Sequence, residues 1–223
     1  MKKLLLGNEA IARGAYEAGV RVSSAYPGTP STEINENVAT YPEIYSEWAP
    51  NEKVAVEVAL GAAVSGARSL ACMKHVGLNV AADPFFTATY TGVNAGMVVV
   101  VADDPGMHSS QNEQDTRMLA RASHAPVLDP SNSQECKDFL KLAYEISEKY
   151  DTPVILRVTT RIAHARTLVE LDERVEVPLR EYKRDIKKYV SMPANMVARH
   201  LYVEEPEKKL AEDANTLPIN RIE

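Results

Sequence analysis

The sequence predicts an α/β fold with a mainly parallel sheet of six strands and helices on both faces. Short apolar runs alternate with helix-like segments from about residue 8 to 160, an order typical of parallel sheets. Two of these runs, MVVVV at 97–101 and VILRV at 154–158, are continuously apolar. Strands buried on both faces have this pattern.

Each strand is predicted from an apolar run, and each helix from a period near 3.6. The six strand segments are VRVSSAY at 20–26, IYSEWA at 44–49, RSLACMKH at 68–75, MVVVVADD at 97–104, APVLDP at 125–130 and TPVILRVTT at 152–160. The clearest helical segments are NEAIARGAYEAG at 8–19, VAVEVALGAAVSG at 54–66 and SQECKDFLKLAYEISEKY at 133–150. Ligands of such sheets bind outside the carboxyl ends of the strands, which directs attention to the loops YPGTPST, WAPNE, KHVGLN and DDPGMHSSQNEQD.

The sequence changes character near residue 166. Residues 1–165 carry the α/β pattern, whereas 166–223 are dense in charge and poor in core-forming residues. We interpret 166–223 as a charged C-terminal extension or linker.

Composition excludes several classes of protein. The net charge is −6, and the basic residues form no cluster before the last fifth of the chain, which argues against nucleic-acid binding. No apolar segment approaches the roughly 20 residues of a membrane span, and MKKLLL is too short for a signal peptide. Cys72 and Cys136 lie far apart, so neither a zinc site nor a disulfide framework is expected. We therefore expect a cytoplasmic protein with no metal ligands of its own.

The loop YPGTPST follows the first strand. Thr29 is a suitable N-cap, Pro30 suits the first helical position and Glu33 suits the first turn. A well-formed strand-to-helix turn explains these residues without a ligand. The alternative is that the Thr29 hydroxyl and nearby backbone N–H groups face a ligand.

Two further loops carry polar groups at strand ends. Lys74, His75 and Asn79 surround Gly77, which permits close backbone approach. In the loop DDPGMHSSQNEQD, Ser110 and Glu113 have the spacing of a capping box, yet the loop is long for a simple connection and suits a lid or substrate wall. The adjacent Asp103 and Asp104 do not predict a metal site.

Glu57 is the one carboxylate between Val54 and Gly66. A buried ionised carboxylate is costly unless it is paired. Glu57 either lies on an exposed stripe with Lys53, Gly61 and Ser65, or has a buried partner beside small residues. The pattern alone slightly favours the exposed stripe.

No GxGxxG, Walker or GxSxG motif is present in the sequence.

Together, YPGTPSTEI, NEKVAVEVALGAA, MKHVGLNVAADP and ADDPGMHSSQNEQD resemble the pyrimidine-binding (Pyr) domain of thiamine-diphosphate-dependent 2-oxoacid:ferredoxin oxidoreductases, of the indolepyruvate type. The resemblance covers roughly residues 3–200. It implies that 1–165 form a Pyr-type domain. It also implies oxidative decarboxylation of a 2-oxoacid, an indolepyruvate or other arylpyruvate, to acyl-CoA and CO2.

The resemblance also implies roles for particular residues. Glu57 matches the family glutamate that hydrogen-bonds to N1′ of the cofactor aminopyrimidine, and Thr29 matches a threonine that contacts substrate near its carboxylate. Cofactor contacts are expected at Glu57, Gly28, Thr29, Gly77 and Asn79, and substrate contacts at Thr29, His75 and Asn79. Pyruvate-type relatives carry an arginine for the substrate carboxylate where this chain has Asp103 and Asp104.

This chain lacks the GDG-type motif and the cysteine clusters that such enzymes need. We therefore expect thiamine diphosphate to be shared with a diphosphate-binding domain or subunit, and Mg2+ and [4Fe-4S] clusters to lie outside this chain. The implied partners are an iron–sulfur or ferredoxin domain, a beta subunit, further copies in a homo-oligomer, and the substrates 2-oxoacid and coenzyme A. Nucleic acid and membrane are not expected partners.

Two other readings remain open. One is the alpha half of a non-oxidative thiamine-dependent 2-oxoacid decarboxylase. The other is a non-catalytic α/β binding module, which predicts that Glu57 is exposed and paired only with Lys53.

Overall fold

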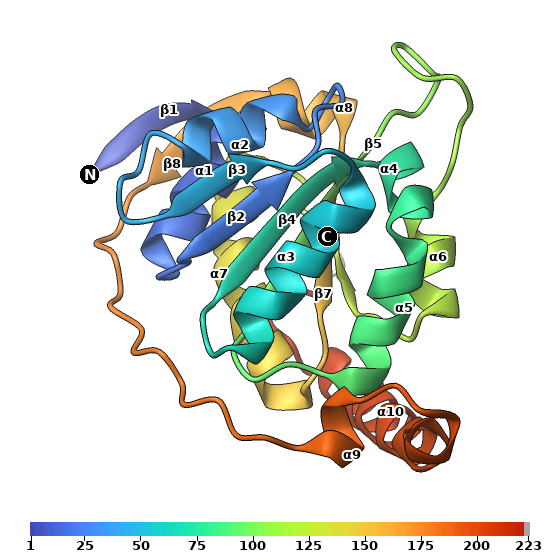
Figure 1. The fold of residues 1–223 in the computed structure, drawn as a ribbon. Coiled ribbons are helices and arrows are strands. Elements are labelled where there is room, and N and C mark those ends of the chain that lie inside the picture. The colour runs from blue at the N-terminus through green and yellow to red at the C-terminus, as the bar shows by residue number, and fades with distance from the viewer. Residues whose placement is uncertain (221–223) are drawn as a thin grey trace.

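The computed structural model describes residues 1–220, and a parallel six-stranded sheet lies at its centre (Figure 1). The strand order is β3-β2-β4-β5-β7-β6, and every neighbouring pair is parallel. The strands are β2 (Val22–Ala25), β3 (Tyr45–Trp48), β4 (Ser69–Lys74), β5 (Met97–Asp103), β6 (Val127–Leu128) and β7 (Val154–Thr159). Each lies within one of the six predicted segments, so the predicted fold class is confirmed.

Helices cover both faces of the sheet (Figure 1). One layer holds α1 (Gly7–Glu17), α2 (Thr32–Val38) and α7 (Ser133–Tyr150). The other holds α3 (Glu52–Val64), α4 (His75–Val80), α5 (Ala82–Thr91) and α6 (Thr116–Ala122). The short helix α8 (Thr160–His164) follows β7 directly.

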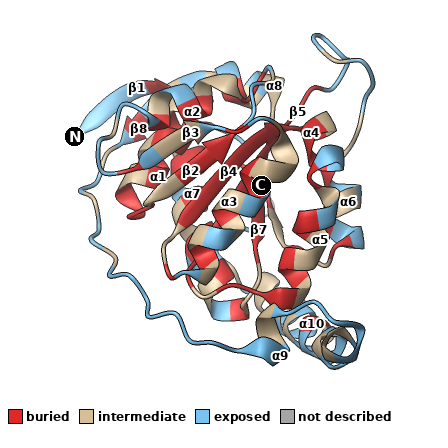
Figure 2. Cartoon of the chain, viewed as in Figure 1, coloured by how far each residue is buried: buried red, intermediate tan, exposed pale blue. Residues whose placement is uncertain are grey.

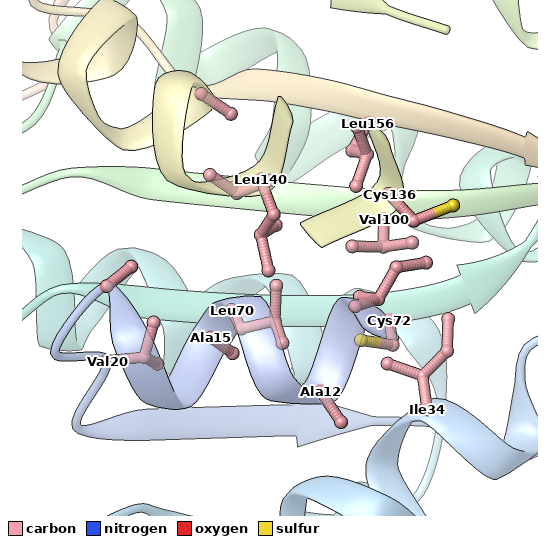
Figure 3. Packing of buried hydrophobic residues seen from close by; sticks show 14 of the residues in the cluster. Ala12, Ala15, Val20, Ile34, Leu70, Cys72, Val100, Cys136, Leu140 and Leu156 are labelled. Carbon is pink, nitrogen blue, oxygen red and sulfur yellow. The ribbon is translucent and has the colours of Figure 1, made fainter. Parts of the chain in front are cut away.

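The apolar run of β5 is explained by the two layers. Val98 and Val100 pack into the cluster under α1 and α7, whereas Val99 and Val101 pack into the cluster under α3 and α5. Alternate side chains of a strand point to opposite faces, so a central strand needs apolar residues at every position. Figure 2 shows the central strands buried along their length, and Figure 3 shows Val100 packed among residues of the neighbouring strands and helices.

Cys72 and Cys136 both lie in the first of these clusters, as free thiols. Burial raises the pKa of Cys136 to about 12 and raises that of Cys72 further. A neutral buried thiol acts as a small apolar residue. Neither cysteine is available for chemistry.

A second, two-stranded sheet is absent from the sequence prediction. Its strands, β1 (Lys2–Leu6) and β8 (Arg166–Glu170), pair antiparallel. The strand β8 therefore ties the start of the 166–223 segment to the N-terminus.

Beyond β8, an extended strap at residues 171–185 runs along the body to the opposite end of the molecule (Figure 1). Arg174 donates hydrogen bonds to the carbonyl oxygens of Tyr16 and Val20, and the Arg180 N–H donates to the carbonyl oxygen of Gly66. Buried Glu17 accepts the Asp172 N–H at 2.8 Å. These bonds tie the strap to the carboxyl-terminal ends of α1 and α3.

The last helices, α9 (Ile186–Tyr189) and α10 (Pro193–Ala214), pack at the end of the molecule opposite the loop after β5 (Figure 1). Lys149 contacts Asp213 at 2.7 Å, and Val203 is buried. Within residues 1–220, no helix is both long and apolar enough to cross a membrane.

Candidate functional site

Because all six strands are parallel, the loops singled out in the sequence lie at one edge of the sheet. We call this edge, formed by residues 26–31, 49–52, 74–79 and 104–115, the carboxyl edge. The strands β2, β3, β4 and β5 end there. Backbone groups and polar side chains at such an edge point away from the core and toward a ligand.

The YPGTPST loop forms a closed turn before α2. The backbone N–H and the hydroxyl of Ser31 both donate to the Gly28 carbonyl oxygen, each at 2.7 Å. The Gly28 N–H donates to the Thr32 hydroxyl at 2.9 Å. The predicted N-cap role of Thr29 is wrong, because this turn delays the helix to Thr32. Thr29 is exposed instead, with its hydroxyl available to a ligand.

Asn8, a residue not predicted to belong to the site, anchors this turn. Its amide nitrogen donates to the Pro30 carbonyl oxygen at 2.8 Å and to Glu33 at 3.2 Å. The side-chain oxygen of Asn8 is buried without a hydrogen-bond partner among the described residues. Burying an unpaired acceptor lowers the stability of the fold, so we infer that the bonds donated by the amide nitrogen are important for the turn. The one sequence feature that could have indicated a role for Asn8 is its position next to Gly7 at the start of a helix.

Glu57 is exposed, so it does not have the buried partner that was one of the two alternatives for it. The inward face of α3 consists of Ala55, Val56, Ala59 and Ala63, whereas Glu57 and Gly61 face outward. Lys53 forms its ion pair with Asp83, at 2.9 Å, rather than with Glu57. The exposed-stripe alternative predicted that Glu57 is exposed, but it did not predict that Lys53 pairs with Asp83.

Glu52 is the carboxylate that faces the carboxyl edge. It is the first residue of α3, which begins after the N-cap Asn51 accepts the Val54 N–H at 3.0 Å. A Cβ atom added at Gly77 would lie 2.5 Å from Oε1 of Glu52. Within residues 1–220, no hydrogen bond or ion pair holds this half-buried carboxylate. An acid directly after an Asn N-cap at a strand end was the available sequence signal.

The polar side chains of the KHVGLN segment hold the loop after β5. Lys74 donates to the Ser109 carbonyl oxygen at 2.5 Å, and Asn79 donates to Gln114 at 2.6 Å. Nε2 of His75 lies 3.1 Å from the Asn112 carbonyl oxygen, so this nitrogen carries the proton. His75 is only 2% exposed. The structure thus brings together Gly28, Lys74, His75, Gly77 and Asn79. His75 is buried against the loop, whereas Asn79 is exposed and contacts the loop from its outer side.

Asp104 organises the same loop from its other end. It accepts hydrogen bonds from the Ser109 N–H at 2.8 Å, the Ser110 hydroxyl at 2.6 Å and the Thr160 hydroxyl at 2.8 Å. Burial raises the pKa of Asp104, but these hydrogen bonds and the charge of Lys74 outweigh burial and hold the pKa well below its ordinary range. The predicted capping box of Ser110 and Glu113 is wrong, because α6 begins later, after the N-cap Asp115.

Asp103 is a structural residue. It pairs with Arg157 at 2.7 Å and accepts hydrogen bonds from Thr116, while Arg157 also pairs with Asp129 at 2.7 Å. No group of His, Cys, Asp or Glu that could hold a metal ion occurs in the described part of the chain. Adjacent Asp103 and Asp104 therefore serve two different networks.

A partly open cavity lies elsewhere in the molecule. It has a volume of about 300 Å³ and lies between α10 and the residues that precede β6 and β7, with Pro126, Thr152 and Tyr202 in its wall. The carboxyl edge presents the exposed aromatic side chains of Tyr26 and Trp48. An edge with exposed aromatics suits a site completed by another domain.

Comparison with known proteins identifies the family. The family model described as "Pyruvate flavodoxin/ferredoxin oxidoreductase, thiamine diP-bdg" matches residues 13–215. The chain is 50% identical to indolepyruvate oxidoreductase subunit IorA of Pyrococcus horikoshii over 100% of this chain and 36% of the relative. It is 31% identical to 2-oxoglutarate synthase subunit KorA of Methanothermobacter thermautotrophicus over 77% of this chain and 48% of the relative.

A solved structure shows the same fold. The 2-oxoglutarate:ferredoxin oxidoreductase from Magnetococcus marinus, with 2-oxoglutarate, coenzyme A and succinyl-CoA bound, superposes with a TM-score of 0.77 at 20% identity. The match covers 95% of this chain and 45% of that chain. Our chain spans only about a third of the length of the IorA relatives, 36% in the Pyrococcus horikoshii protein. The chain belongs to the thiamine-diphosphate-binding domain family of pyruvate flavodoxin/ferredoxin oxidoreductases.

Proposed function

We propose that this chain is the pyrimidine-binding part of an indolepyruvate-type (arylpyruvate) 2-oxoacid:ferredoxin oxidoreductase. The reaction is oxidative decarboxylation of a 2-oxoacid to acyl-CoA and CO2, with electrons passed to ferredoxin. The observation that supports it best is the Glu52 carboxylate, which packs against Gly77 at the carboxyl edge and has no hydrogen-bond or ion-pair partner among residues 1–220. The names of relatives at 50% and 51% identity support the choice of substrate class.

The residues at the carboxyl edge fit the aminopyrimidine half of thiamine diphosphate. A flat ring needs small neighbours for close approach and a carboxyl group for its ring nitrogen. Glu52 supplies the carboxyl group, and Gly77 leaves the room that its side chain occupies. In this proposal the small residues of the YPGTPST turn, Gly28 among them, lie beside the ring. The described residues contain no metal-ligand cluster, so the diphosphate, Mg2+ and [4Fe-4S] clusters belong to other domains or subunits in this proposal.

In this proposal Glu52, rather than Glu57, exchanges a proton with N1′ of the pyrimidine. When bound, thiamine diphosphate supplies the electron sink that decarboxylation of a 2-oxoacid requires. Glu52 lies in the first turn of α3, and its carboxyl group would hydrogen-bond to the ring nitrogen N1′ of the bound cofactor. Glu57 faces outward on the same helix and has no such role.

The other predicted residues keep proposed roles in two groups. Gly28 and Thr29 contact cofactor and substrate from the β2–α2 turn, where Thr29 is exposed. His75 and Asn79 act by holding the loop at residues 105–114, which forms the wall of the substrate site.

The proposed partners supply the groups that bind diphosphate, Mg2+ and iron–sulfur clusters, for which this sequence carries no motif. A diphosphate-binding domain, an iron–sulfur or ferredoxin domain and a beta subunit complete the enzyme in a homo-oligomeric assembly. Exposed Tyr26, Trp48 and Val80 lie around the carboxyl edge and suit burial against such a domain.

The test is reconstitution of this chain with the remaining domains and subunits. We expect arylpyruvate and coenzyme A to give acyl-CoA, CO2 and reduced ferredoxin, with thiamine diphosphate required. Release of CO2 and aldehyde without any electron acceptor would favour the non-oxidative decarboxylase instead. No turnover and no thiamine requirement in a verified complex would contradict both.

A further inference from the structure

Lys74 is a buried cation with an incomplete set of partners. It is the last residue of the central strand β4, and it is only 6% exposed. Within residues 1–220, no carboxylate lies at salt-bridge distance from its ammonium group. Lysine is rarely buried without a partner, because desolvating an unpaired charge is costly.

The partners that Lys74 does have leave donors free. Its Nζ atom donates to the Ser109 carbonyl oxygen at 2.5 Å, whereas an ammonium group has three N–H donors. Asp104 lies near enough to interact electrostatically with Lys74. However, both Asp104 oxygens already accept hydrogen bonds, from Ser110 and Thr160 among others.

The side chain of Lys74 spans two loops of the candidate site. A Cβ atom added at Gly28 would lie 3.2 Å from Cβ and 3.7 Å from Cδ of Lys74, so the aliphatic stem runs against the YPGTPST turn. The ammonium group reaches Ser109 in the loop after β5. The charge therefore lies between the turn that carries Thr29 and the loop that walls the site.

We propose that Lys74 binds the carboxylate of the 2-oxoacid substrate. This inference rests on the proposed function and names the residue that recognises the substrate's charge. A carboxylate would supply the missing acceptors for the ammonium group and form charge-assisted hydrogen bonds. The charge of Lys74 also offsets that of nearby Asp104, which would otherwise repel an anionic substrate; Asp103 is already paired with Arg157.

Arg161 on α8 is the competing cation at this edge. It is exposed and makes no ion pair or side-chain hydrogen bond within residues 1–220. A solvated guanidinium needs no further partner, whereas a buried ammonium does. The burial of Lys74 therefore favours it over Arg161 as the residue that binds the substrate carboxylate.

The test uses the assembled enzyme and two unreactive ligands, an arylpropionate and its neutral amide. We expect the wild type to bind the acid about 10- to 100-fold more tightly than the amide, the range of a charge-assisted hydrogen bond. Lys74→Met should abolish this preference, and Lys74→Arg should retain part of it. For arylpyruvate, Lys74→Met should raise KM far more than it lowers kcat.

Controls separate a binding role from a structural one. Lys74→Gln keeps a donor for the Ser109 carbonyl oxygen without the charge, so it should fold like the wild type and still lose the preference. Lys149→Met, at the opposite end of the molecule, should change neither the preference for the acid over the amide nor the KM for arylpyruvate. Retention of the acid preference in folded Lys74→Gln, or its loss in Arg161→Met alone, overturns the assignment.

A second readout distinguishes failure of this inference from failure of the proposed function. Hydrogen–deuterium exchange at thiamine C2 needs no substrate carboxylate, so Lys74→Met should leave it unchanged. A wild-type complex that lacks this exchange refutes the proposed function. A wild-type complex that has it, with an acid preference that survives in Lys74→Met, refutes the role of Lys74 alone.

Discussion

Glu52 and Gly77 are in contact at the carboxyl edge of the sheet, and only a glycine leaves room for the carboxylate there. A Cβ atom at position 77 would lie 2.5 Å from Oε1, 2.6 Å from Cγ and 2.8 Å from Cδ of Glu52. The position of the Glu52 carboxylate therefore depends on two elements, the N-terminus of α3, which carries Glu52, and α4, which carries Gly77.

Gly77→Ala should displace the Glu52 carboxylate without unfolding the chain. Glu52 is a flexible side chain and α4 tolerates alanine, so we expect the free energy of unfolding to change by less than about 1 kcal/mol. Misplacement of a catalytic group by about 1 Å can cost roughly 100-fold, so C2 exchange in the assembled enzyme should fall by at least about 10-fold. Wild-type exchange in this variant would show that the contact has no functional role.

Gly66→Ala should loosen the strap at residues 171–185. Gly66 has a φ of +101°, and an added Cβ would lie 1.9 Å from the Arg180 carbonyl oxygen. We expect a loss of about 1–3 kcal/mol in the free energy of unfolding and faster hydrogen exchange near Arg180. Gly61→Ala is the matched control, because nothing lies within 4 Å of its added Cβ. It should stabilise α3 by about 0.5–1 kcal/mol. Equal effects of the two substitutions would contradict the strap geometry.

Asp104→Asn should change how stability depends on pH. The pKa of Asp104 is depressed in the folded chain, so its ionised form contributes stability above the unfolded-state pKa of about 3.9. That contribution is lost as pH falls through the lower folded-state pKa. The difference in Tm between wild type and variant should be largest above about pH 5 and shrink toward about pH 2. A difference that is constant over this range would contradict the role of the ionised carboxylate.

The sheet was predictable because its signal is local. Continuous apolar runs such as 97–101 can be satisfied only by strands covered on both faces, and the structure places them there. The pairing of β1 with β8 was not predictable, because it joins segments 160 residues apart through a strand with three exposed residues. No periodicity marks such a pairing.

The site was predicted at the level of loops but not of every residue. The loops at residues 26–31 and 74–79 lie where expected, because parallel strands end at one edge. The exposure of Glu57 was not settled by the sequence, because its small neighbours suggested close packing, whereas the register of α3 is set by its start. The N-cap Asn51 fixes that start and directs Ala55, Val56 and Ala59 inward. Glu52, the residue we propose as the N1′ partner, was not singled out, since a first-turn acid is also an ordinary helix feature.

Hydrogen–deuterium exchange at thiamine C2, compared in Glu52→Gln and Glu57→Gln, tests the central claim most directly. Both substitutions are nearly isosteric, and both should leave the fold intact in the assembled enzyme. Glu52→Gln should slow exchange by about 100-fold or more, the range of a positioned acid–base group, because an amide cannot exchange a proton with N1′. Glu57→Gln should stay within about twofold of wild type. Slow exchange in Glu57→Gln together with normal exchange in Glu52→Gln would contradict this account and restore Glu57 as the pyrimidine partner.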